Sequence, residues 1–207
     1  MTSLTQSKGA FTALRGFSRK QQAAEKCELC GLILAGDHAH LFEHAEARLL
    51  CACEACAILF YHRPGEVKYS RVPPTARRLT NFHITDAEWN ALMLPINMAF
   101  FQDCTRVGRV VAYYPSPAGC TESLLDLSAW HEIVRNNAVL AGLLPDVETL
   151  LVNRTRDRRD YYIAPIDQCY RLAGLMRVHW QGLSGGELVW EKIGEFFESL
   201  DRQACLT

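Results

Sequence analysis

Cysteines with metal-binding spacing are concentrated in one short stretch of this 207-residue sequence. Cys27 and Cys30 form one Cys-x2-Cys pair, and Cys53 and Cys56 form a second pair further along the chain. This spacing lets neighbouring thiolates bind one ion, and zinc takes four thiolates in a tetrahedral shell at about 2.3 Å per Zn–S bond. We therefore predict a metal site made of Cys27, Cys30, Cys53 and Cys56.

Cys51 is a third thiol beside the second pair. Cys51 and Cys53 are separated by one residue, which would make a strained chelate, whereas Cys53 and Cys56 repeat the spacing of the first pair. We therefore assign Cys51 as a spare thiol and a possible substitute ligand.

Three histidines between the two pairs could also replace a cysteine: His38, His40 and His44. On an alternating hairpin His38 and His40 share one face. Histidines in such positions more often face solvent or pack than bind a metal.

The residues that follow each pair indicate the kind of metal. Gly31 follows Cys30, and glycine suits a tight turn with positive φ that aims backbone N–H groups at the sulfurs. Cys56 is followed by an apolar, helix-compatible run from Ala57 to Tyr61 instead of a second glycine. This asymmetry favours zinc in a treble-clef-like or zinc-ribbon-like module, with rubredoxin-like iron or an iron–sulfur cluster as the alternative cofactor. Four thiolates close the coordination shell, which predicts a structural role.

The segment that carries the cysteines is too small to bury a core of its own, so we expect the metal to hold it together. We divide the sequence into a mobile leader (1–25), a four-cysteine zinc module (26–63), a connector (64–79) and an α+β domain (80–203). The connector contains an alternating run, residues 67–72, which predicts a short exposed strand. Within the leader, a short helix is expected near residues 11–17.

The α+β domain interleaves strands and helices irregularly. Two capping boxes, Thr85 to Glu88 and Ser184 to Glu187, each predict the start of a helix. Further helices are expected over 126–135 and from Pro165 to Gly182, so that two consecutive helices close the chain. Apolar runs predict strands at 96–101, 107–114 and 147–152, with 161–164 as a partner of the last. This order favours a mixed α+β fold over a doubly wound parallel sheet.

A small polar segment after the strand at 107–114 is a candidate binding loop. Its residues that could contact a ligand are Ser116, Gly119, Thr121 and Glu122. The segment matches neither the nucleophile elbow nor the phosphate loop, and Cys120 is a nucleophile only in principle. An enzyme acting here would need a pocket with converging polar side chains, so we assign no catalytic residue.

Composition argues against several classes of function. A net charge of −1 and a pI near 6.6 provide no overall basic field, so binding to nucleic acid is not expected. No run approaches the roughly 20 apolar residues of a membrane helix, and residues 1–26 do not have the pattern of a secretory signal. We therefore expect a cytoplasmic protein, in which clustered cysteines bind metal instead of forming disulfides.

Five patterns follow one another along the chain: Cys27-Glu-Leu-Cys-Gly31, Leu49-Leu-Cys-Ala-Cys-Glu-Ala-Cys56, Gly108-Arg-Val-Val-Ala-Tyr-Tyr-Pro-Ser-Pro-Ala-Gly119, Glu122-Ser-Leu-Leu-Asp-Leu127 and Gly182-Leu-Ser-Gly-Gly186. Together they resemble a bacterial family of unknown function that is encoded beside high-affinity nickel–iron hydrogenases and their maturation proteins. Cys120 stands where that family more often has a small residue, which weakens its interpretation as a nucleophile. The resemblance implies a context and not a mechanism.

These observations favour a non-catalytic, zinc-binding accessory protein that assists the assembly or maturation of a nickel–iron hydrogenase through protein–protein contacts. Its expected partner is a hydrogenase subunit or a maturation factor. The alternative is an iron-binding redox or metal-transfer protein.

Overall fold

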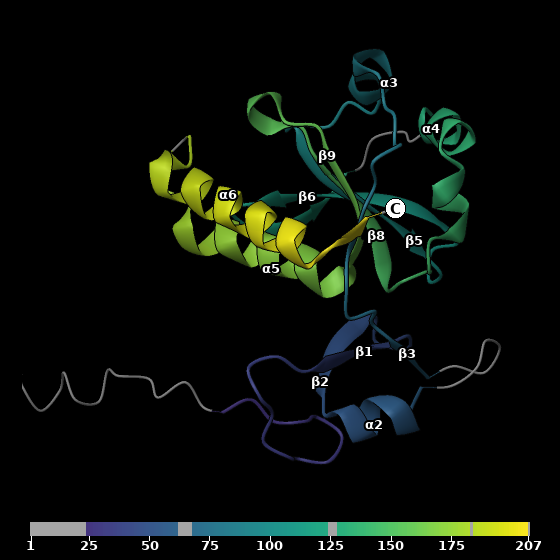
Figure 1. The fold of residues 1–207 in the computed structure, drawn as a ribbon, viewed down its shortest axis with the longest axis vertical. Coiled ribbons are helices and arrows are strands. Elements are labelled where there is room, and N and C mark those ends of the chain that lie inside the picture. The colour runs from purple at the N-terminus through teal and green to yellow at the C-terminus, as the bar shows by residue number, and fades with distance from the viewer. Residues whose placement is uncertain (1–23, 62–67, 124–127, 183, 207) are drawn as a thin grey trace, which may run out of the picture.

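A computed structural model describes residues 24–61, 68–123, 128–182 and 184–206 (Figure 1). Within these ranges the chain forms two β-sheets, a small one early in the sequence and a larger one flanked by helices. The expected leader falls almost entirely outside the described residues, and so does its helix near residues 11–17. Along the described chain, no helix combines the length and the hydropathy needed to cross a bilayer.

The small sheet has the strand order β2-β1-β3. β1 (Ala39–Glu43) and β2 (Arg48–Ala52) form an antiparallel hairpin, and β3 (Tyr69–Arg71) pairs antiparallel with β1. The helix α2 (Glu54–Leu59) follows β2 directly. We call this sheet, α2 and the loop before β1 the cysteine module. The strand expected in the connector is therefore present as β3, but it belongs to the small sheet and Tyr69 is buried.

The two faces of the small sheet pack against different partners. Leu41 and Leu50 lie opposite each other in the hairpin and pack in a small core with three of the cysteines. Phe42 and Leu49, the next pair, point to the other face because side chains alternate along a strand. They pack against the core of the large sheet, which joins the module to the rest of the chain.

The large sheet has the strand order β10-β4-β9-β8-β5-β6-β7. Every pairing in it is antiparallel except that of β10 with β4. The strands are β4 (Arg77–Arg78), β5 (Met98–Cys104), β6 (Arg109–Ser116), β7 (Gly119–Glu122), β8 (Glu148–Asn153), β9 (Asp160–Pro165) and β10 (Cys205–Leu206). The predicted pairing of residues 147–152 with 161–164 is confirmed as the β8–β9 hairpin.

Helices cover both faces of the large sheet (Figure 1). Met98 and Phe100 of β5 pack in one core with α5 (Ile166–His179) and α6 (Gly186–Gln203). Ala99 and Phe101 pack in the other core with three further helical segments. These segments are α3 (Asp86–Ala91), α4 (Trp130–Asn136) and the 3-10 helix η1 (Ala138–Gly142); a second 3-10 turn, η2 (Thr155–Asp157), lies between β8 and β9. The predicted mixed α+β fold is therefore confirmed. We call the large sheet with these helices the seven-stranded domain.

The two predicted capping boxes have different outcomes. At α3 the Glu88 amide donates to the Thr85 hydroxyl at 3.1 Å and the Thr85 amide donates to the Glu88 carboxylate at 2.7 Å, as predicted. The box predicted from Ser184 to Glu187 is wrong. The N-cap of α6 is Gly185, which has a left-handed backbone conformation, and no side chain caps the helix. The sequence predicts Pro165 as the first residue of α5. It is instead the last residue of β9 and the N-cap of α5, so that the helix begins one residue later, at Ile166.

Candidate metal centre

Backbone hydrogen bonds fold the segment around Cys27 and Cys30 into a tight turn. The Gly31 amide donates to the Cys27 carbonyl at 2.8 Å, and the Cys27 amide donates to the Leu32 carbonyl at 2.8 Å. Gly31 has a φ of 76°, a conformation that L side chains rarely adopt. The tight turn with positive φ predicted at Gly31 is therefore confirmed.

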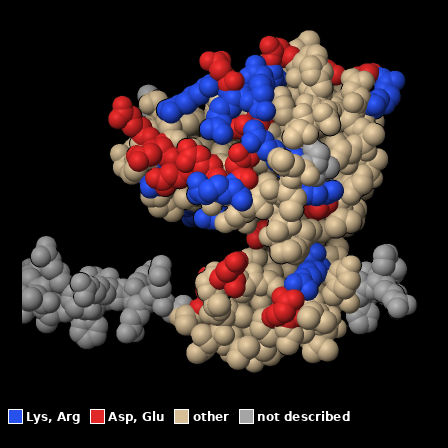
Figure 2. Space-filling model, in the orientation of Figure 1, with Lys and Arg blue, Asp and Glu red and all other residues tan. Residues whose placement is uncertain are grey.

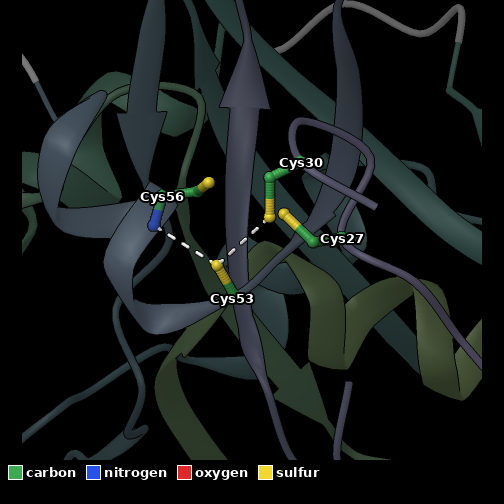
Figure 3. A group of neighbouring side chains, drawn as sticks. All are labelled: Cys27, Cys30, Cys53 and Cys56. Carbon is green, nitrogen blue, oxygen red and sulfur yellow. Dashed lines mark hydrogen bonds between the residues drawn. The ribbon is translucent and has the colours of Figure 1, made fainter. Parts of the chain in front are cut away.

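The second pair of cysteines lies at the start of α2. Cys53 is the N-cap residue of this helix, and its Sγ atom accepts a hydrogen bond from the Cys56 amide at 3.4 Å. Cys56 lies in the first turn, which directs its sulfur to the same side as that of Cys53 (Figure 3). Hence a loop supplies two of the thiols and a helix start supplies the other two.

The four sulfurs converge (Figure 3). All four lie within 4.8 Å of one another, and the Sγ atoms of Cys30 and Cys53 are 3.8 Å apart. In a tetrahedral zinc site with Zn–S bonds of about 2.3 Å, neighbouring sulfurs are about 3.8 Å apart. The arrangement of Cys27, Cys30, Cys53 and Cys56 therefore fits a metal ion such as zinc.

Burial and backbone donors affect the thiols of this cluster unequally. Burial raises the pKa of Cys27, but hydrogen bonds from the backbone at Cys53, Leu29 and Cys30 outweigh it and lower that pKa to about 6. Burial and the neighbouring sulfurs raise the pKa of Cys56 to about 12. For Cys30 the backbone at Leu32 lowers the pKa, yet Cys27 and burial together leave it raised. At neutral pH a metal ion would bind one existing thiolate, Cys27, and displace the protons of Cys30 and Cys56.

Glu28, between the first two cysteines, ties their turn to the hairpin. Its amide donates to the Cys51 carbonyl at 2.9 Å, and its carboxylate accepts from the Cys51 amide at 2.9 Å. Arg48 donates to Glu28 at 3.4 Å and to Glu43 at 2.9 Å. The turn and the strand β2 are thus fixed to each other through backbone and side chain.

Cys51, expected as a spare thiol, lies outside the four-sulfur group. Its ligand atom is within 4.8 Å of those of His38 and His40, because the hairpin register places Cys51 directly opposite His40. None of the three histidines belongs to the four-sulfur group; His44 contacts Ser70 at 2.8 Å and Asp146 at 3.2 Å. The alternating pattern predicted the shared face of His38 and His40, but not their proximity to Cys51. Pairing the two strands around a turn at residues 44–47 would have revealed it.

The predicted binding loop is a β-hairpin and not an open loop. Ser116 ends β6, while Gly119, Thr121 and Glu122 lie on β7. The Ser116 and Thr121 hydroxyls are 2.9 Å apart, and Arg109 donates to Glu122 at 3.4 Å, so these polar groups contact one another. Burial raises the pKa of Cys120 to about 11, which keeps it a thiol at neutral pH. Ligand binding at this hairpin stays a prediction.

A pocket of about 320 Å³ lies elsewhere on the seven-stranded domain. It is lined by Ile96, Asn97, Met98, Thr155, Arg156, Met176 and Trp190. No residue of the β6–β7 hairpin lines this pocket. It therefore does not supply the converging polar side chains that an enzyme acting at the hairpin would need.

A family model matches most of this chain. It is described as a family of unknown function (DUF5947) and matches residues 26–204, which cover nearly all of the cysteine module and of the seven-stranded domain. No curated protein and no solved structure matches the chain.

Proposed function

The chain belongs to the DUF5947 family, a family of unknown function. We propose that it is a non-catalytic, zinc-binding accessory protein that acts through protein–protein contacts. The observation that carries the proposal is the convergence of four cysteine sulfurs beside a set of exposed apolar side chains. The metal would shape the surface, and the apolar side chains would contact the partner.

The donor set supports zinc in a structural role. Four thiolates fill a tetrahedral shell and leave no position for a substrate or a reactive water. Three of the four cysteines are buried, and Cys30 is exposed. Zinc also suits the asymmetry between the glycine turn after Cys30 and the helix that contains Cys56.

Apolar side chains surround the metal-binding segments on the outside of the cysteine module. They lie in the loop after Cys30 and at the end of α2, and each is between 42 % and 69 % exposed: Leu32, Ile33, Ile58, Leu59, Phe60 and Tyr61. Figure 2 shows few charged side chains on the visible face of the module away from the large sheet. Exposed apolar side chains grouped on one part of a molecule are a feature of protein interaction sites. We call these six side chains the apolar rim.

The proposed partner is a nickel–iron hydrogenase subunit or one of its maturation factors. This part of the proposal rests on the resemblance of the cysteine, Gly108–Gly119 and Gly182–Gly186 patterns to a family encoded beside such hydrogenases. The apolar rim gives a physical reason to expect a protein and not a small molecule as the partner.

Co-purification from the native host tests the proposal. The tagged full-length protein should bring down a hydrogenase subunit or maturation factor, and an Ile33→Ser/Leu59→Ser double variant should recover it at least about tenfold less, since apolar anchors carry much of the binding energy at interfaces. Val178→Ser is the matched control, because Val178 is 74 % exposed on α5, outside the apolar rim. If the wild type recovers neither protein, and deletion leaves hydrogen uptake intact, the proposal fails.

Iron is the competing metal. The alternative function is an iron-binding redox or metal-transfer protein, and the exposed thiol of Cys30 suits metal transfer because an exposed ligand allows metal exchange. An iron-binding redox or metal-transfer protein would be coloured after anaerobic purification. Elemental analysis with a visible spectrum separates the two: a colourless protein with zinc excludes the iron-binding alternative.

A further inference from the structure

His38 has a buried ring nitrogen that makes no hydrogen bond to any described residue. Its side chain is only 8 % exposed, and this nitrogen is Nε2. The other nitrogen, Nδ1, lies 3.0 Å from the Ala35 carbonyl oxygen, which can only accept, so Nδ1 carries the proton. Nε2 is therefore an unprotonated lone pair in a buried position. A histidine that only packed in the core would leave this buried acceptor unpaired, which destabilises the folded state.

His40 also has an acceptor beside its Nδ1 nitrogen, although its side chain is 26 % exposed. Its Nδ1 lies 3.3 Å from a carboxylate oxygen of Asp167, in the first turn of α5, so Nδ1 is again the protonated nitrogen. This leaves Nε2 as the atom that can bind a metal. Histidine ligands in metal sites commonly donate their second N–H to a carboxylate or a backbone carbonyl, which fixes the ring and the tautomer. His38 is supported in this way by a backbone carbonyl, and His40 by a carboxylate.

Cys51 completes the group from the neighbouring strand. It lies opposite His40 in the β1–β2 register, and the ligand atoms of all three residues lie within 4.8 Å of one another. In a tetrahedral site two imidazole nitrogens and one sulfur would be about 3.3–3.6 Å apart. Rotation of the three side chains, with the hairpin backbone fixed, can bring their ligand atoms from within 4.8 Å to these shorter distances.

We propose that His38, His40 and Cys51 form a second metal site, separate from the four-cysteine centre, which binds a divalent transition metal of the zinc class. Two nitrogens and one thiolate exclude Mg²⁺ and Ca²⁺, which require oxygen ligands, and select metals of intermediate softness. On binding, Cys51 releases its thiol proton to solvent and the sulfur becomes the anionic ligand. Three protein ligands leave one coordination position for a water or an exogenous ligand.

The position of this site gives it a structural consequence. His38, His40 and Cys51 belong to the cysteine module, whereas Asp167 belongs to the seven-stranded domain. A metal held by His40 strengthens the polarity of its N–H group and thereby the contact with Asp167. Metal binding at the second site would therefore strengthen the His40–Asp167 contact between the cysteine module and the seven-stranded domain. This inference does not depend on the proposed partner.

Cobalt titration of the full-length protein tests the second site. Reduced, metal-free protein is titrated anaerobically with Co²⁺, whose absorption bands report the number of thiolate ligands. We expect two equivalents, one with a four-thiolate spectrum and one with weaker sulfur charge-transfer bands. His38→Ala and Cys51→Ser should abolish only the second, and Asp167→Asn should weaken it about 10- to 100-fold.

His44→Ala is the matched control, since His44 lies on the same hairpin but outside the group, and it should keep both equivalents. The four-thiolate spectrum serves in each variant as the measure of correct folding. Binding of a single equivalent by the wild type would overturn the proposal. So would a second equivalent that survives both His38→Ala and Cys51→Ser.

Discussion

The cysteine module and the seven-stranded domain are stabilised in different ways. The module's core has eight buried members, of which three are cysteines of the four-sulfur group. The seven-stranded domain has two cores of eighteen and fifteen buried members, rich in Phe, Leu, Ile and aromatic pairs, one on each face of its sheet. Burial of apolar area can account for the stability of the domain, whereas the module is small enough to need a metal.

This difference explains why the module can present apolar side chains to solvent. A small fold held by hydrophobic burial alone would need Ile58 and Leu59 inside, yet both are more than half exposed. A metal bound at the four-cysteine centre would supply stability and leave these side chains free to contact a partner. Substitutions in the cysteine module and in the seven-stranded domain, each followed by a measurement on the other part, test this difference.

Removal of a metal ligand should have the largest effect. Cys27→Ser or Cys56→Ser should release the metal of the four-cysteine centre and unfold the module, because apparent zinc-binding energies of about 10 kcal/mol or more are also folding energy. Hydrogen exchange should increase in peptides from residues 24–61 and stay unchanged in β8 and β9. Cys51→Ser is the control and should retain this metal. Equal loss of this metal from Cys51→Ser and Cys53→Ser would contradict the ligand assignment.

A cavity in the core of the large sheet should destabilise the seven-stranded domain and leave metal binding by the cysteine module unchanged. Phe197 is fully buried and stacks on Tyr162 with ring centroids 6.2 Å apart, so Phe197→Ala should lower the free energy of unfolding of the seven-stranded domain by about 3–5 kcal/mol. Urea unfolding measures this change. The exposed Val178→Ala should change it by less than about 0.5 kcal/mol. If folded Phe197→Ala protein retains its metal, the cysteine module and the seven-stranded domain are stabilised independently. Loss of the metal from this variant would contradict that.

Acid should weaken metal binding at the four-cysteine centre. The pKa values of Cys30 and Cys56 are raised, so both thiols are protonated at neutral pH and must lose their protons to bind. Affinity should therefore fall at least about a hundredfold per pH unit between about pH 8 and pH 6. Below the pKa of Cys27, about 6, the fall should become steeper because that thiolate is protonated too. Competition with a chelator at several pH values measures the slope; a flat profile would rule out these protonation states.

A change of backbone conformation at the turn should have the smallest effect. Gly31→Ala places a side chain at a φ of 76° in otherwise open space, which costs about 1–2 kcal/mol and should weaken metal binding about tenfold. Gly36 also has open space around it but no positive φ, so Gly36→Ala is the matched control. Equal affinities of the two variants would show that the turn does not limit metal binding.

Patterns that depend on near neighbours were predictable from the sequence. The Thr85–Glu88 box and the close approach of cysteines within each pair follow from contacts that span three residues. The β8–β9 pairing is also local, because one short turn joins the strands. Ser184 and Glu187 have the same spacing as Thr85 and Glu88 but form no box. Gly185 and Gly186 both have positive φ, and a Cβ atom at Gly185 would lie 2.9 Å from a methyl carbon of Val189.

The second group of ligands required information that the sequence does not display. His40 and Cys51 are brought together by strand register, which depends on where the hairpin turns. Asp167 reaches His40 only because the module packs on the seven-stranded domain. The strand order has the same origin, since β4 (Arg77–Arg78) pairs with β10 (Cys205–Leu206), which lies far later in the sequence. Such contacts depend on packing between distant segments and not on local preference.

The place of β4 in the large sheet has a consequence for the order of events during protein synthesis. β4 lies between β9 and β10, which come from the last part of the described chain, so the sheet cannot close around it until those residues have left the ribosome. The cysteine module spans residues 24–72 without any strand from later in the sequence. Domains fold as units during translation, beginning with the N-terminal one. If the four-cysteine centre binds a metal, the nascent chain could bind it while the seven-stranded domain is still being translated.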